Sequence, residues 1–124
     1  MWRAFLVSLS VVLMGPAIAS AADLEVIDKN CWVEIFDDDE FDQDDPHVKI
    51  QGPAEHAALT DLYGRNWNND IESLIVGSSA TVHAWIAKDF KGPEMTFAPG
   101  QRVSKLSKLK MANAIQSMKI TCGP

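Results

Sequence analysis

The residues with the most obvious chemistry form one acidic run, Asp37-Asp38-Asp39-Glu40-Phe41-Asp42-Gln43-Asp44-Asp45. Carboxylate oxygens are the hard donors that calcium prefers in proteins. The run does not match an EF-hand loop, because no starting point places Gly at the sixth position and Glu at the twelfth. Two interpretations stay open. The run binds a divalent cation, or it is a solvated acidic edge that prevents sheet-to-sheet aggregation.

The acidity of the chain is local. The whole sequence has 11 Lys+Arg and 17 Asp+Glu, for a net charge of −6. Residues 23–70 hold 14 acidic and 3 basic side chains (net −11), whereas residues 71–124 hold 3 acidic and 7 basic ones (net +4). The acidic balance argues against binding to nucleic acid or to an anionic membrane. Repulsion within the run should destabilise the fold, and a divalent cation would relieve it. The opposite charges of the two parts also allow head-to-tail self-association.

The sequence lacks the common catalytic motifs. His47, His56 and His83 have no Cys or second His at metal-ligand spacing, which argues against a zinc site. The sequence contains neither a Gly-x-Ser-x-Gly motif nor a P-loop. We therefore expect a protein that is not an enzyme.

The first residues are typical of a secretory signal peptide. Met1-Trp2-Arg3 gives a short positive start, and an apolar stretch over 4–19 follows. Ala17-Ile18-Ala19 and Ala19-Ser20-Ala21 both satisfy the small-x-small rule for cleavage. We expect removal of residues 1–22 and a secreted or periplasmic mature protein without a membrane segment.

Two cysteines remain, Cys31 and Cys122, one near each end of the mature chain. In an oxidising compartment an even pair favours a disulfide over two free thiols. The bridge would enclose about 90 residues and contribute up to roughly 4–5 kcal/mol in the loop-entropy description.

The elements that must position these groups are short, β-branched or aromatic segments between turn signals, which predicts an all-β sandwich or barrel. The segments expected as strands are 31–36, 47–50, 73–76, 80–85, 94–97 and 117–121. Residues 104–114 could hold one short helix.

The chain also repeats itself. Three pairs of segments correspond in the same order: Phe36 and Phe41 with Trp85 and Phe90 (offset 49), 48–50 with 95–97 (offset 47), and 67–76 with 111–120 (offset 44). Each copy is too small to bury a core alone, so two four-stranded units packed face to face are expected.

The segment from Trp85 to Gly92 resembles the aromatic-x6-Gly Greek-key signature of the βγ-crystallin superfamily. The first copy has Gln43 where the signature has Gly, so its hairpin is expected to be looser. The resemblance covers residues 31–122 and implies two Greek-key motifs packed as a βγ-crystallin-like sandwich. Key one would span about 31–78 and key two about 79–122, after a short lead at 23–30.

The resemblance also implies calcium bound between the keys. The superfamily's signature is [Asn/Asp]-[Asn/Asp]-x-x-[Ser/Thr]-Ser, and residues 68–73 match it except that Glu72 stands at the fifth position. Residues 112–117 keep only Asn113 and Ser117, with Gln116 at the fifth position. Because each site in the superfamily joins one key's loop to the other key's hairpin, Asp37 and Asp38 are expected to face the second loop. The implied metal ligands are Asp37, Asp38, Asn68, Asn69, Asp70, Glu72, Ile86 (through its backbone carbonyl), Asn113 and Gln116.

The sequence supports two functions. One is a secreted calcium-binding domain whose ion stabilises the fold or tunes association. The alternative is a calcium-independent interaction module or protease-inhibitor-like protein, because small secreted bacterial metalloprotease inhibitors resemble this fold. The sequence does not identify a protein partner for either function.

Overall fold

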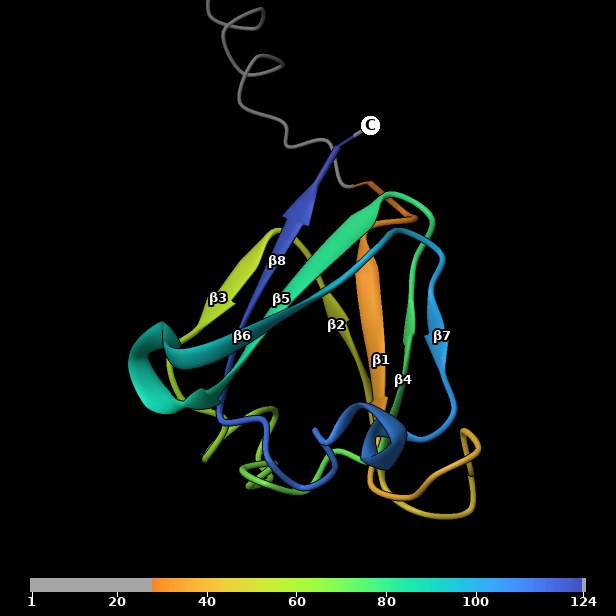
Figure 1. Ribbon diagram of the computed structural model, residues 1–124. Helices are drawn as coiled ribbons and strands as arrows, with labels where there is room; N and C mark the ends of the chain where they lie inside the picture. The colour runs from red at the N-terminus through yellow and green to blue at the C-terminus, as the bar shows by residue number, and fades with distance from the viewer. Residues whose placement is uncertain (1–27, 124) are drawn as a thin grey trace, which may run out of the picture.

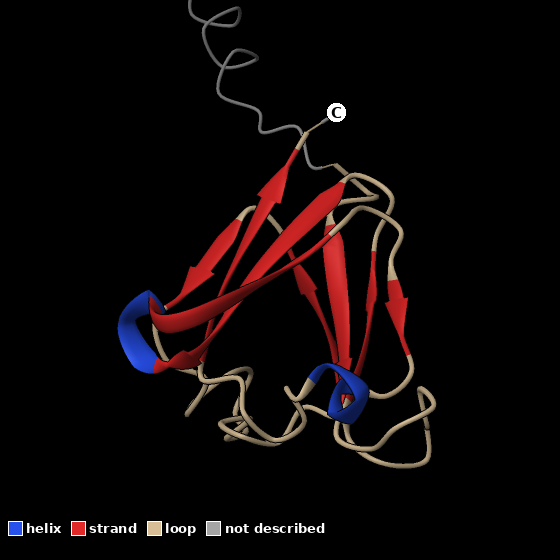
Figure 2. Cartoon of the chain, viewed as in Figure 1, coloured by secondary structure: helices blue, strands red, loops and turns tan. Residues whose placement is uncertain are grey.

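The computed structural model describes residues 28–123, which form two antiparallel four-stranded sheets (Figure 1). The signal peptide expected over residues 1–22 and the first part of the expected lead lie outside the described residues. Within the described part, no helix is long and apolar enough to cross a membrane. Figure 2 shows that strands dominate this part and that helical structure is confined to short turns.

Strand β5 (Ala80–Ala87) shows the period-two alternation that a half-buried strand requires. In β5, Ala80, Val82 and Ala84 are buried between the sheets, whereas Thr81 and His83 are only partly covered. The strands are β1 (Trp32–Phe36), β2 (His47–Gln51), β3 (Ala54–His56), β4 (Ser73–Val76), β5 (Ala80–Ala87), β6 (Lys91–Phe97), β7 (Arg102–Val103) and β8 (Ser117–Cys122). The all-β prediction is confirmed.

The two copies of the repeat exchange their third strands. One sheet has the order β2-β1-β4-β7 and the other β3-β8-β5-β6. Each sheet therefore combines three strands from one half of the chain with one short strand from the other half (Figure 1). The expected sandwich of two Greek-key motifs is confirmed, but each sheet belongs to both copies. Because of this exchange, neither copy can complete a sheet without the other.

All six expected strands are present, and two further strands were not predicted. β3 has three residues and β7 has two, and neither contains a run of apolar side chains. Within the expected helical segment 104–114, only Leu106–Leu109 forms a short 3-10 turn, η3. A second 3-10 turn, η2 (Lys88–Phe90), follows β5.

A disulfide joins the two sheets. Cys31, just before β1, is bonded to Cys122 at the end of β8, with 5.5 Å between the Cα atoms, which confirms the predicted pair. The chain crosses from β2 in one sheet to β3 in the other at Gly52, directly beside this bond. A Cβ atom on Gly52 would lie 2.6 Å from Ile120 Cγ2 and 2.7 Å from Cys31 Sγ. Only glycine fits at this crossing.

Candidate metal centre

The acidic loop (residues 37–46) connects β1 to β2 and is attached to the core at two points. Phe36 and Phe41 pack edge to face with 5.8 Å between the ring centroids. The fully buried hydroxyl of Ser73 donates to Asp38 O (2.6 Å) and accepts from Phe41 N (3.2 Å). Glu40 and Phe41 have positive φ values of 59° and 57°. The start of the loop is therefore held in one defined conformation.

The second copy has an equivalent aromatic pair and an equivalent buried serine. Trp85 and Phe90 pack edge to face at 5.3 Å. Ser117 Oγ donates to Ala87 O (2.6 Å) and accepts from Phe90 N (3.1 Å). The two buried serines are thus equivalent, and each folds a hairpin back over its own aromatic pair.

The two hairpins differ in length. Phe36 pairs with His47, whereas Trp85 pairs with Glu94, so 10 residues lie between the paired residues of the first hairpin and 8 between those of the second. Gly92 uses a positive φ of 85° to make the tighter turn, and Gln43 is not among the positive-φ residues. The two extra residues replace the glycine turn with a wider acidic loop.

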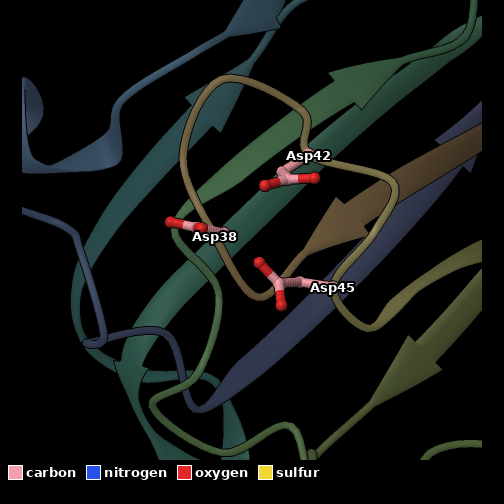
Figure 3. A group of neighbouring side chains, drawn as sticks. All are labelled: Asp38, Asp42 and Asp45. Carbon is pink, nitrogen blue, oxygen red and sulfur yellow. The ribbon is translucent and has the colours of Figure 1, made fainter.

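Three carboxylates of this loop converge. One oxygen each of Asp38, Asp42 and Asp45 can be chosen so that all three lie within 4.8 Å of one another. In Figure 3 the side chains of Asp42 and Asp45 extend into the space that the loop encloses. The pKa of Asp45 is raised by its hydrogen bond with Asp38, then by desolvation and by the negative charge of Asp42. We call these three residues the Asp trio.

Basic side chains form ion pairs with acidic side chains on both flanks of the loop. Arg65 Nη2 lies 3.2 Å from Asp37 Oδ2. On the other flank, Lys105 Nζ lies 3.6 Å from Asp39 Oδ2 and 3.5 Å from Glu40 Oε1. Among residues 28–123, no Lys, Arg or His forms an ion pair with the Asp trio. The trio is therefore the uncompensated centre of the acidic loop.

The two signature loops are joined to each other by reciprocal backbone hydrogen bonds. Asn69 N donates to Ile115 O, and Asn113 N donates to Ile71 O, each at 3.2 Å. Asn69 and Asn113 also share positive φ values of 61° and 54°. This symmetry confirms the repeat of residues 67–76 and 111–120.

The fifth position of each signature loop lies beside the hairpin of its own copy. Glu72 N donates to Phe36 O and Gln116 N donates to Trp85 O, both at 2.9 Å. The hairpin that holds Asp37 and Asp38, which is expected to face the second loop, therefore meets Glu72 of the first loop. The physical reason is strand pairing: β4 runs antiparallel to β1, so the residue before β4 meets the end of β1.

Glu72 consequently joins the acidic group. Its pKa is raised first by burial and then by the charges of Asp38, Asp39, Asp37 and Asp70. Asn68 Oδ1 is buried and has no hydrogen-bond partner among the described residues, so an acceptor in this loop is free. The structure thus brings together one part of the expected ligand set: Asp37, Asp38, Asp70 and Glu72.

The remaining expected ligands do not form an equivalent acidic group. Near the second hairpin, Gln116 and Asn113 are neutral, and Ile86 offers only backbone oxygen. Lys119 Nζ lies 4.4 Å from the ring centroid of Phe90, which places a positive charge on this hairpin. The two halves of the fold therefore share their strand arrangement, but the acidic hairpin of the first has a less acidic counterpart in the second.

Sequence reasoning missed four residues of the centre. It assigned ligand roles to Asp37 and Asp38 but not to Asp42 and Asp45, because the loop's path was unknown. It also missed Arg65 and Lys105, which are distant in sequence. One signal was available: Arg65 is one of the 3 basic side chains within residues 23–70.

Comparison with solved structures finds this fold in βγ-crystallin domains. A structure concerning the evolution of the eye lens βγ-crystallin domain fold aligns with a TM-score of 0.68 and 17% identity, over 82% of this chain and 95% of its own. The N-terminal domain of protein S aligns with a TM-score of 0.62 and 19% identity, over 75% and 98%. A βγ-crystallin domain from Clostridium beijerinckii aligns with a TM-score of 0.58 and 22% identity, over 72% and 95%. No protein-family model matches the chain, and a comparison with curated proteins finds no match. The likeness shows that the chain has the βγ-crystallin fold.

Proposed function

We propose, from this βγ-crystallin fold, that the protein is a non-catalytic, secreted or periplasmic domain that binds one calcium ion at its acidic loop and is stabilised by it. The observation that carries the proposal is the Asp trio, with three carboxylate oxygens within 4.8 Å of one another. Carboxylates at this separation repel each other. A bound divalent cation removes this repulsion and so stabilises the folded state that binds it.

The donors around the trio fit calcium better than a transition metal. The converging side chains are all carboxylates, and neither His nor Cys belongs to the group. Calcium takes six to eight oxygens at flexible angles, whereas zinc and copper favour nitrogen and sulfur. Asp38, Asp42 and Asp45 would hold the ion, Glu72 would add charge close to Asp38, and water would complete the shell.

Partial exposure of the ligands sets the expected strength of binding. Asp38 and Asp42 are half-buried and Asp45 is exposed. One oxygen of Asp38 already accepts from Asp39 N (2.8 Å), and one oxygen of Asp42 accepts from Asp44 N (2.9 Å). We therefore expect a dissociation constant on the order of 10⁻⁴ to 10⁻³ M, the range of extracellular calcium modules.

A single ion is expected rather than two. The second hairpin has the positive charge of Lys119 close to Phe90 and no converging carboxylates among residues 28–123. Asn113, Gln116 and the backbone of Ile86 supply too little charge to remove a calcium ion from water.

Secretion is supported by the N-terminal sequence and by the disulfide. Cys31 and Cys122 are bonded in the folded chain, and such bonds persist mainly in oxidising compartments. A secreted domain also meets calcium at the millimolar level that weak exposed sites require.

Isothermal calorimetry of chelator-treated protein tests the proposal. Calcium binding should release or absorb heat with a stoichiometry of about one ion per chain, and the melting temperature should rise at millimolar calcium. Asp45→Asn removes a trio ligand and should weaken binding. Asp44→Asn is the matched control, because Asp44 lies in the same loop outside the trio. Absence of both heat and thermal shift in the wild-type protein would refute the proposal and favour a calcium-independent interaction module.

A further inference from the structure

Arg65 lies between the two acidic segments that meet at the candidate metal centre. Its Nη2 atom is 3.2 Å from Asp37 Oδ2, in the acidic loop, and 3.3 Å from Asp70 Oδ2, in the first signature loop. One nitrogen thus bridges two carboxylates from segments that are far apart in the sequence.

The guanidinium group is held in this position from two sides. Its central carbon lies 4.1 Å from the ring centroid of Trp67, whose side chain is only 2% exposed. The backbone of Arg65 is fixed by reciprocal hydrogen bonds with Leu62, of 2.9 and 3.2 Å. An ordinary surface ion pair lacks such anchors and gains little from its charge. Here stacking on Trp67 restricts the guanidinium, and the turn with Leu62 fixes the backbone that carries it.

We infer that Arg65 is a built-in cation that takes the place of a metal ion between Asp37 and Asp70. The inference rests on the proposed calcium function, and it goes further by dividing the acidic group into two parts. Arg65 neutralises Asp37 and Asp70, and the Asp trio remains for calcium.

The same geometry predicts what happens when the arginine is removed. Asp37 and Asp70 would then face each other without a counter-charge, close to Glu72. The buried Asn68 Oδ1, which has no partner among residues 28–123, is a further oxygen donor in this loop. An arginine-free variant therefore offers a second set of oxygen ligands, and its fold should become dependent on calcium.

The variant Arg65→Met tests this, because methionine keeps an unbranched side chain that can cover Trp67. In chelator its melting temperature should fall below that of the wild type, and calcium should restore it. Calcium affinity, measured by calorimetry, should be roughly tenfold or more tighter than in the wild type, a factor equal to about 1.4 kcal/mol. The number of bound ions should also rise.

Arg102→Met is the matched control. Arg102 also stacks beside the acidic loop, with its guanidinium carbon 4.7 Å from the ring centroid of Phe41. It forms no ion pair with a carboxylate in the described part of the chain. Loss of one positive charge near the loop is therefore common to both variants, and loss of the bridge occurs only in Arg65→Met.

The outcomes separate this inference from the proposed function. A wild type that does not bind calcium, together with an Arg65→Met variant that does, would refute the proposed function and support the inference. Arg65→Met that is destabilised without calcium rescue would overturn the inference, whatever the wild type does. Equal gains in calcium affinity for Arg65→Met and Arg102→Met would also overturn it. The gain would then come from the loss of a positive charge near the loop and not from vacating the position between Asp37 and Asp70.

Discussion

Ser73 and Ser117 form a matched pair for testing how the fold supports the candidate metal centre. Both side chains are fully buried, and each hydroxyl makes one short bond to a carbonyl and one to an amide of its hairpin. Ser73 holds the acidic loop, and Ser117 holds the second hairpin, where the expected ligands are neutral. Replacing either serine with alanine removes equivalent bonds from equivalent places. The two variants should therefore agree in stability and differ in calcium binding.

The size of the stability loss follows from the hydrogen bonds. A buried hydrogen bond contributes about 0.5–1.5 kcal/mol, and an unpaired buried group costs about 1–3 kcal/mol. Two bonds are lost in each variant, and water can reach part of the half-buried partners. We expect each substitution to lower the free energy of unfolding by roughly 2–3 kcal/mol. For a domain of this size the melting temperature should fall by on the order of 10 °C.

The effect on calcium should be confined to Ser73→Ala. This variant frees the carbonyl of Asp38 and the amide of Phe41, so the loop must be ordered when the ion binds. An ordering cost of one or two kcal/mol weakens binding by a factor of about 5–30. Ser117→Ala leaves the acidic loop attached and should bind calcium like the wild type.

Urea unfolding in chelator and calorimetric calcium titration measure the two effects separately. Calcium affinity that falls equally in both variants would refute the reasoning, because Ser117 is not linked to the acidic loop by any described hydrogen bond. A stability loss below about 1 kcal/mol in both variants would refute the assigned role of the serines.

Three further predictions concern the scaffold and its charge. Replacing Cys31 and Cys122 together with alanine should lower the free energy of unfolding by roughly 4–5 kcal/mol, since the bond closes a loop with a sequence separation of 91; a loss under about 1 kcal/mol in urea unfolding would contradict this. Gly52→Ala should destabilise the fold by roughly 1–3 kcal/mol, because its Cβ would lie 2.6 Å from Ile120 Cγ2; an unchanged melting temperature would show that the crossing can relax. The fold raises the pKa of Asp45 and of Glu72 above the ordinary values of 3.8 and 4.5. The folded state therefore binds these protons more tightly than the unfolded state, and this contribution to metal-free stability is lost as the pH rises through the folded-state pKa values. In chelator, the melting temperature of the wild type should fall between about pH 4 and about pH 7. The fall should be smaller in Glu72→Gln and smaller still in the wild type with calcium. An equal fall in all three samples would contradict the prediction.

The repeat was readable from the sequence because strands and turns use local rules. Buried strands such as β1 and β4 alternate or run apolar, and the aromatic pairs recur at fixed spacing. Even the change in offset from 49 to 47 records the two extra residues that the structure places in the first hairpin. β3 and β7 were not readable, because strands of three and two residues are defined by their neighbours rather than by their own side chains.

Only some residues of the candidate metal centre could be predicted from the sequence. Asp37, Asp38 and Glu72 carry acidic side chains within or beside recognisable motifs, so composition and resemblance pointed to them. Convergence of Asp42 and Asp45 with Asp38 depends on the path of a loop, for which no local pattern exists. The partners of Glu72 also depend on which strands pair, since pairing brings residue 72 to the end of β1.

The sequence by itself determined the all-β class, the internal repeat, the disulfide pair and the concentration of negative charge in one hairpin. These properties are sums or spacings along the chain, so they survive without knowledge of the fold. Only the tertiary structure decided that the two copies exchange strands and that Arg65 and Lys105 neutralise the flanks of the acidic loop. Electrostatic interactions depend on distance in space. Arg65 and Lys105 lie tens of residues along the chain from Asp37 and Asp39, and they reach these carboxylates only in the folded structure.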